Sequence, residues 1–143
     1  MNALKEGDKA PQFLELTANK GSTVVVYFYP KDFTPGCTTE ACEFRDMYEK
    51  IQENNAVVIG ISPDSPESHE KFIAKHGLPY TLVADETHEI AAAYGVWGEK
   101  SMYGKKFMGI ERSTFVIGPD GDIKKIFRRV KPAGHAEEVL AAI

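Results

Sequence analysis

Apolar residues in this chain gather in short runs separated by segments with helical spacing. The runs are rich in β-branched and aromatic residues, which is typical of buried strands. They cover residues 24–29, 56–61, 80–84, 113–117 and 123–130, and weaker alternation at 12–16 predicts a short edge strand. Apolar positions three and four apart, or capping residues, predict helices over 35–53, 65–76, 87–94 and 134–143. Residues 102–108 are predicted to be extended or irregular.

The order of these elements predicts an α/β architecture. Strands alternate with helices through the middle of the chain, which implies parallel pairing through right-handed crossovers. Residues 118–121 form a turn between the last two strands, so these strands should pair as a hairpin. We expect a mixed central β-sheet with helices on both faces, in a single domain over residues 1–143.

Composition and charge narrow the function classes. A net charge of −4 provides no basic surface for nucleic acid. No apolar run approaches the roughly 20 residues of a membrane span, and the N-terminal residues lack the apolar core of a secretory signal. We therefore expect a cytoplasmic protein with no nucleic-acid or membrane partner. Paired cysteines in that compartment tend to be catalytic or redox-sensing.

The first of the two cysteines lies where the chain passes from a strand into a helix. Cys37 follows the strand at 24–29 and a loop of turn-forming residues, with Thr34 as the predicted N-cap and Pro35 as the first helical residue. Unpaired amides at a helix start favour negative charge, so this position favours a reactive thiolate. A reactive cysteine after the first central strand of such a sheet suggests a thioredoxin-like fold.

Cys42 lies five residues after Cys37 on the same predicted helix. Helix geometry separates Cα atoms at this spacing by roughly 8–9 Å, whereas a disulfide needs them within about 7 Å. The two thiols can therefore pair only if the first helical turns unwind. We assign Cys37 as the nucleophile and Cys42 as the resolving thiol, in a cycle with a helical reduced form and a locally unwound oxidised form.

Other residues can assist such chemistry. A thiolate that attacks a peroxide O–O bond becomes a sulfenic acid, which condenses with a second thiol. Thr34 and nearby backbone amides can donate hydrogen bonds, and Pro30 can help to shield the pocket. The candidate cation is Arg112, because a guanidinium does not deprotonate. Arg45 is less suitable, since it lies about 12 Å along the helix from the reactive thiol.

These residues carry a family resemblance. The segment PKDFTPGC, residues 30–37, resembles the peroxiredoxin pattern P-x-x-x-T-x-x-C. The following CTTEACEFRD resembles the branch called bacterioferritin comigratory protein or peroxiredoxin Q, and similar segments recur in order along nearly the whole chain. The resemblance implies a thioredoxin-fold thiol peroxidase that is often monomeric and uses no metal or haem.

The same resemblance implies a set of site residues, substrates and a reductant. By position, Cys37 would be peroxidatic and Cys42 resolving, with Pro30, Thr34 and Arg112 completing the site. Hydrogen peroxide and small organic hydroperoxides would be reduced to water and alcohols, in antioxidant defence and redox homeostasis. Thioredoxin would restore the thiols.

One segment departs from the family. Between residues 16 and 24 the family usually has a longer stretch, with a second hairpin strand and a helical turn, whereas this chain has only TANKGST. The active-site motif is untouched, so we expect the chemistry to survive. The N-terminal hairpin is the feature that this difference puts in doubt.

Other interpretations of the residues remain open. The cysteines could be two inert buried thiols, or the chain could be a non-catalytic binding domain. It could also be a disulfide oxidoreductase or redox-sensing module, although it lacks the C-x-x-C spacing. A zinc site is disfavoured, because neither the cysteines nor the histidines show ligand spacing. We interpret Asp64 as a capping or solvated charge. Solvated positions on helix faces are the interpretation for the four histidines, His69, His76, His88 and His135.

Overall fold

The computed structural model describes residues 4–143. Its helices are α1 (Leu14–Ala18), α2 (Pro35–Glu53), α3 (Pro66–His76), α4 (Glu89–Ala93) and α5 (His135–Ala142). Its strands are β1 (Thr23–Phe28), β2 (Ala56–Ser62), β3 (Thr81–Ala84), β4 (Trp97–Met102), β5 (Lys105–Ile110), β6 (Ser113–Ile117) and β7 (Ile123–Phe127). Over this part of the chain, no helix combines the length and the apolarity that crossing a membrane requires.

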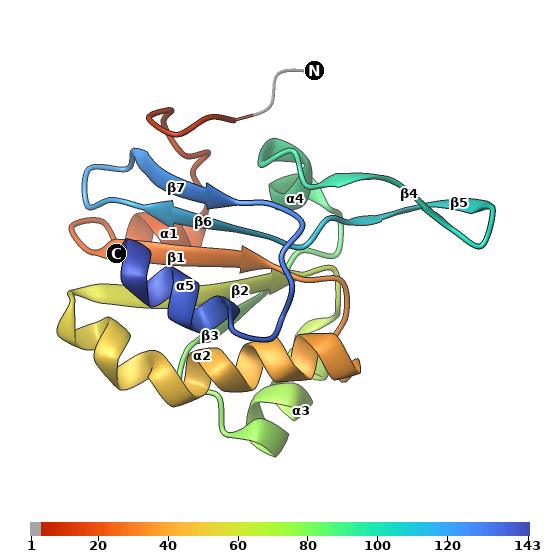
Figure 1. Cartoon of the computed structure of the whole chain (residues 1–143), viewed down its shortest axis with the longest axis horizontal. Helices are drawn as coiled ribbons and strands as arrows, with labels where there is room; N and C mark the ends of the chain where they lie inside the picture. The colour runs from red at the N-terminus through yellow and green to blue at the C-terminus, as the bar shows by residue number, and fades with distance from the viewer. Residues whose placement is uncertain (1–3) are drawn as a thin grey trace.

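Five strands form the central sheet, in the order β3-β2-β1-β6-β7 (Figure 1). β1 runs parallel to β2, and β2 runs parallel to β3. β6 pairs antiparallel with both β1 and β7. The structure therefore confirms the expected mixed sheet, with parallel pairing through the crossovers and a hairpin at its C-terminal edge.

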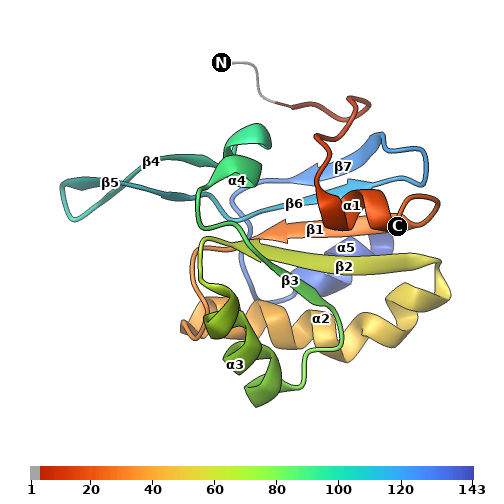
Figure 2. The ribbon, with the colours of Figure 1, turned by 180° about the vertical axis from the view of Figure 1, so that it is seen from behind.

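Helices cover both faces of this sheet, as predicted (Figures 1 and 2). α2 and α5 pack on one face, where Phe44 and Val139 join the same apolar cluster as Tyr27 of β1. α1 and α4 lie on the other face, where Phe28 belongs to a second cluster. β1 is thus buried on both sides, which explains its uninterrupted apolar run.

The edge strand predicted at residues 12–16 is wrong. This segment enters the short helix α1, in which the amide of Thr17 donates to the carbonyl of Phe13 at 3.0 Å. Leu16 is buried against the sheet, whereas Leu14 is 78% exposed. A single buried apolar residue fits one helical turn as well as it fits strand alternation, so the pattern was ambiguous at this length.

Residues 97–110 form a hairpin that the sequence pattern did not reveal. β4 and β5 pair antiparallel and project from the body of the molecule (Figures 1 and 2). Tyr103 and Gly104 make the turn with positive φ values of 52° and 77°. The outer part of the hairpin is exposed on both sides and has no core-facing alternation. Residues 102–108 are therefore extended around a tight turn.

The other predicted elements are present with small differences at their ends. α4 begins at Glu89 and is shorter than the predicted helix. β7 ends at Phe127 instead of continuing to residue 130, because Arg129 adopts a left-handed backbone with φ of 50°. The chain turns there and leads into α5.

The fold brings two segments that are distant in the sequence, the β1–α2 connection and the start of β6, to one end of the sheet. β1 ends at Phe28, just before the loop that leads into α2. Antiparallel pairing places Ser113, the first residue of β6, opposite Phe28. Arg112 precedes Ser113, so it meets the start of α2 although it lies 75 residues from Cys37 in the sequence.

Candidate active site

Cys37 lies in the first turn of α2, as the sequence predicts. The helix begins at Pro35, after Thr34 in an extended conformation with φ of −80° and ψ of 151°. Cys37 is 1% exposed and belongs to the apolar cluster beneath α2. Amides in the first turn of a helix have no intrahelical partner, so this end of α2 favours a negative charge.

A guanidinium group lies against the sulfur. Nη2 of Arg112 donates a hydrogen bond to Sγ of Cys37 at 3.2 Å. The backbone of Arg112 is held as well, because its carbonyl accepts from the amide of Val130 at 3.0 Å. Gly36 is closely packed beside it, since an added Cβ would lie 3.3 Å from Pro132, a tight contact, and 3.5 Å from Nη2, an ordinary one. A fixed cation in a buried setting stabilises a thiolate.

Glu40 joins this pair, and our sequence reasoning missed it. Its Oε1 accepts from Nη1 of Arg112 at 2.7 Å, so one guanidinium bridges a carboxylate and a thiol. Glu40 is 1% exposed, and its Oε2 has no hydrogen-bond partner within residues 4–143. Burial raises the pKa of Glu40 to about 7, against the opposing effect of Arg112. Its position three residues after Cys37, on the same helix face, was the available signal.

Replacing Glu40 by glutamine should change how stability depends on pH. A buried acid with a raised pKa binds more protons in the folded state than in the unfolded state between about pH 4.5 and 7. The wild type should therefore lose more stability than Glu40→Gln as pH rises through this window. We expect the difference in unfolding free energy between the two proteins to change by about 2–3 kcal/mol between pH 4.5 and 8.

Urea unfolding of both proteins at several pH values measures this difference. Effects of all other titrating groups cancel in the comparison. Parallel stability profiles for wild type and Glu40→Gln would contradict a carboxyl group that titrates near neutral pH at this site.

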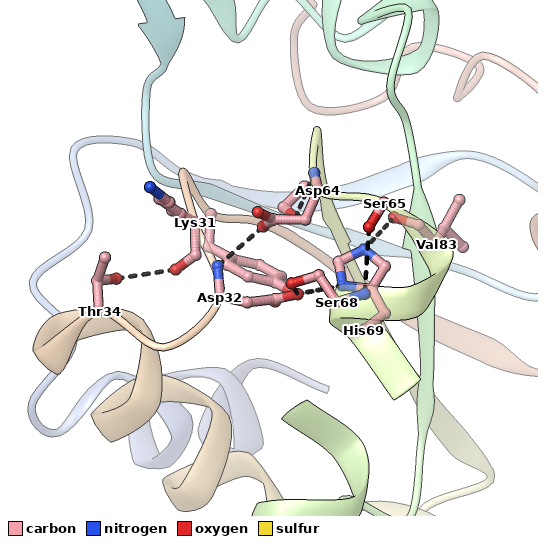
Figure 3. Close-up of polar contacts among 10 residues, drawn as sticks. Lys31, Asp32, Thr34, Asp64, Ser65, Ser68, His69 and Val83 are labelled. Carbon is pink, nitrogen blue, oxygen red and sulfur yellow. Dashed lines mark hydrogen bonds and ion pairs between the residues drawn. The ribbon is translucent and has the colours of Figure 1, made fainter. Parts of the chain in front are cut away.

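The other site residues predicted from the sequence lie in α2 or in the loop before it. Both cysteines are free thiols, and Cys42 is partly buried, further along α2. Pro30 directly follows Tyr29 at the end of the buried stretch and is itself partly buried. Thr34 occupies the N-cap position, but its hydroxyl donates to the carbonyl of Lys31 at 2.8 Å instead of capping α2 (Figure 3). It shapes the loop in front of the helix.

A buried polar network holds this loop in place (Figure 3). Asp32 is 3% exposed and accepts hydrogen bonds from Tyr29 at 2.6 Å and from Ser68 at 2.8 Å. The Nδ1 atom of His69 lies 2.7 Å from the same carboxylate. Next to Asp32, Phe33 has a φ of 66°, which is strained for a residue other than glycine. The network ties the strained loop to α3, so the shape of the site depends on that helix.

His69 and Asp32 form an ion pair. Nε2 of His69 lies 3.1 Å from the carbonyl oxygen of Val83, which only accepts, so Nε2 carries a hydrogen. Burial disfavours the charged ring, but the hydrogen bond and charge of Asp32 outweigh it and raise the pKa of His69. Burial likewise opposes ionisation of Asp32, but the hydrogen bonds from His69 and its neighbours prevail and lower the pKa of Asp32. Both shifts favour an imidazolium facing a carboxylate.

The interpretation of the histidines as solvated helix-face residues is wrong for two of the four. His69 and His135 are 3% and 0% exposed. His135 is the first residue of α5 and packs against α2 and the sheet, with Nε2 located 2.7 Å from the hydroxyl of Thr114. His76 and His88 are partly exposed. Helical periodicity alone does not separate a buried, hydrogen-bonded histidine from a solvated one.

Asp64 also differs from its interpretation as a capping or solvated charge. Its carboxylate accepts from the hydroxyl of Ser62 at 2.6 Å and from the amide of Asp32 at 2.8 Å. The side chains of Asp32, Asp64 and His69 each offer an atom that could ligate a metal ion, and these atoms lie within 4.8 Å of one another. Because these groups already hydrogen-bond with one another and with their neighbours, we interpret the cluster as the anchor of the loop.

Comparison with known sequences identifies relatives of this chain. The AhpC/TSA family profile matches residues 3–126. Peroxiredoxin Bcp from Bacillus subtilis is 49% identical over 146 residues, which cover 96% of this chain and 93% of the relative. Peroxiredoxin Bcp from Escherichia coli is 44% identical over 149 residues, which cover 98% of this chain and 96% of the relative.

Comparison with solved structures agrees with the sequence relatives. A PrxQ mutant from Xylella fastidiosa matches with a TM-score of 0.91 and 40% identity, covering 99% of this chain and 96% of that one. The bacterioferritin comigratory protein of Xanthomonas campestris, solved in a study of its alkyl peroxide reduction activity, matches with a TM-score of 0.86 and 46% identity. That match covers 89% of this chain and 80% of the other. These neighbours confirm the predicted thioredoxin-like fold.

Proposed function

Because this chain belongs to the AhpC/TSA family, and within it to the Bcp/peroxiredoxin Q thiol peroxidases, we propose that Cys37 is its peroxidatic residue and Cys42 its resolving residue. The observation that carries the proposal is the hydrogen bond of 3.2 Å from Arg112 to a thiol that is 1% exposed. A nucleophilic cysteine needs a cation and a helix start that favour its thiolate. Arg112, just before β6, supplies the cation, and α2 supplies the helix start.

In the first step the Cys37 thiolate attacks one oxygen of a hydroperoxide. A sulfur–oxygen bond forms and the O–O bond breaks, so the sulfur is oxidised to a sulfenic acid. The leaving oxygen takes up a proton and departs as water or an alcohol. Arg112 stabilises charge on the sulfur and on the oxygen under attack, Glu40 orients Arg112, and Pro30 and the Thr34 loop screen the site from bulk water.

In the second step the sulfenic acid condenses with the Cys42 thiol, which forms a disulfide and releases water. The two thiols lie on one continuous helix, so the first turns of α2 must unwind for this bond to form. A dithiol protein then reduces the disulfide by thiol exchange, and we assign this role to thioredoxin. Hydrogen peroxide and small organic hydroperoxides are the substrates, and the enzyme acts in the cytoplasm as a monomer.

A Cys42→Ser variant tests the assignment of the two thiols. The first attack should proceed within about twofold of wild type, because Cys42 lies outside the Arg112 contact. Turnover with thioredoxin should fall at least about tenfold, since no intramolecular disulfide forms, and Cys37 should accumulate sulfinic acid. Peroxide consumption coupled to thioredoxin, its reductase and NADPH measures turnover, and intact mass after each peroxide equivalent identifies the oxidised species.

Wild type should show one disulfide per peroxide consumed in the same mass measurement. A Cys42→Ser variant that turned over at the wild-type rate without sulfinic acid would remove Cys42 from the cycle.

A further inference from the structure

Two buried tyrosine hydroxyls form a hydrogen-bonded chain that ends on the backbone next to Cys42. The hydroxyl of Tyr80 donates to the carbonyl of Ala41 at 2.8 Å, and the hydroxyl of Tyr27 lies 2.9 Å from that of Tyr80. A carbonyl only accepts and a hydroxyl has a single hydrogen, so Tyr27 donates to Tyr80. Both phenols are buried, and burial raises their pKa values, so they remain protonated donors.

The position of these hydroxyls is fixed by the sheet and by the part of α2 beyond Cys42, and not by the turns between the two cysteines. Tyr27 lies within β1, and Tyr80 immediately precedes β3. A Cβ at Gly60, which pairs with Tyr27 across the sheet, would lie 2.8 Å from the Tyr27 ring. The Tyr27 ring also stacks, with a centroid separation of 4.8 Å, on Phe44, which lies in α2 after Cys42. The donor pointing at Ala41 therefore stays in place whether or not the start of α2 is helical.

Disulfide formation moves the acceptor of this chain. Ala41 lies between the two cysteines, within the turns that must unwind before the sulfurs can meet. When these turns unwind, the carbonyl of Ala41 leaves Tyr80, and a buried hydroxyl loses its acceptor. Buried donors without partners are unfavourable, so the penalty falls on the unwound form.

We propose that Tyr80 is a positioning residue that holds α2 in its helical, peroxide-reactive form, and so sets the division of the Cys37 sulfenic acid between two fates. One fate is condensation with Cys42, which gives a disulfide and water. The other is attack on a second hydroperoxide, which gives a sulfinic acid and an alcohol or water. By delaying unwinding, Tyr80 favours the second fate. This inference rests on the proposed roles of Cys37 and Cys42.

A Tyr80→Phe variant tests the inference, because phenylalanine keeps the ring and removes the donor. We expect disulfide formation to become about fivefold faster, the factor that corresponds to one typical hydrogen bond of about 1 kcal/mol. The peroxide concentration that gives half over-oxidation should rise by a similar factor. The rate of the first attack should not change. Rapid-quench mass spectrometry reports all three quantities, and amide exchange reports the opening of residues 38–42.

Two further variants make the comparison sharp. Tyr48→Phe removes a hydroxyl that is not part of the hydrogen-bonded chain ending at Ala41. The ring of Tyr48 lies 5.7 Å from that of Tyr80, so this variant is a nearby control, and it should behave as wild type. Tyr27→Phe weakens the chain but leaves Tyr80 bonded to Ala41, so it should shift the division in the same direction by a smaller factor. This variant keeps the test available if Tyr80→Phe does not fold.

The outcomes distinguish a failure of the role proposed for Tyr80 from a failure of the proposed Cys37–Cys42 cycle. The role of Tyr80 would be overturned if Tyr80→Phe formed the disulfide at the same rate as wild type or Tyr48→Phe and over-oxidised at the same peroxide concentration. Slower disulfide formation in Tyr80→Phe would overturn it as well. A wild-type protein that formed no Cys37–Cys42 disulfide would instead overturn the proposed cycle itself.

Discussion

A Cys37→Ser variant is expected to consume no hydroperoxide above the uncatalysed background. A serine hydroxyl is not ionised at neutral pH and forms no sulfenic acid, so both the attack and the disulfide step are lost. The loss should be at least on the order of 10⁶-fold, the lower end of typical enzymatic rate enhancements. Single-turnover loss of hydrogen peroxide, followed with and without thioredoxin, measures it.

The control for this result must separate chemistry from folding. Cys37 is buried in an apolar cluster, and serine is close to it in size, so the urea midpoint should show that the variant folds. Cys42→Ser is the matched partner, since it changes the same atom on the same helix and should keep the first attack. Continued turnover by Cys37→Ser would refute the assignment of Cys37 as the nucleophile and show that another residue reduces the peroxide.

An Arg112→Met variant should lose about 10²- to 10³-fold in the rate of the first attack. Methionine fills part of the same space but removes the donor that lies 3.2 Å from the sulfur. Removal of one preorganised donor at a site of developing charge has an effect of this size in other enzymes. Stopped-flow measurement of Cys37 oxidation at several peroxide concentrations gives the second-order rate constant.

Loss of Arg112 also leaves Glu40 buried without its cation, so stability needs its own control. The double variant Arg112→Met/Glu40→Gln removes both charges and should recover stability but not the attack rate. Arg45→Met is the matched arginine variant on α2, where Arg45 donates to the carbonyl of His76 at 2.7 Å, and it should keep the attack rate. If Arg112→Met retained a rate within threefold of wild type, the guanidinium would have no part in the chemistry.

Glu40 and His69 show why part of the site escaped sequence reasoning. Glu40 looks like an ordinary polar residue of an amphipathic helix, and His69 like an ordinary residue on a helix face. Their burial depends on segments far away in the chain, Arg112 for Glu40 and the Asp32 loop for His69. A local pattern carries no information about such partners.

The short elements at the rim were missed for a different reason. α1 buries Leu16 alone, and most of the β4–β5 hairpin is solvent-exposed. Elements that bury little apolar surface leave little periodicity in the sequence. The long, strongly patterned elements, β1 and α2 above all, were predicted to within a residue or two of their observed ends.

The amino-acid order by itself determined the central strand, the helix start at Pro35 and the position of Cys37 in its first turn, because strand burial and helix capping depend on neighbouring residues. It also determined the spacing of Cys37 and Cys42, and with it the prediction that a disulfide between them requires unwinding of the helix. Tertiary structure alone decided that Arg112 reaches the sulfur, that Glu40 shares this arginine, and that Tyr80 donates to the backbone beside Cys42. These contacts depend on strand pairing across the sheet, and pairing follows from the packing of the whole chain.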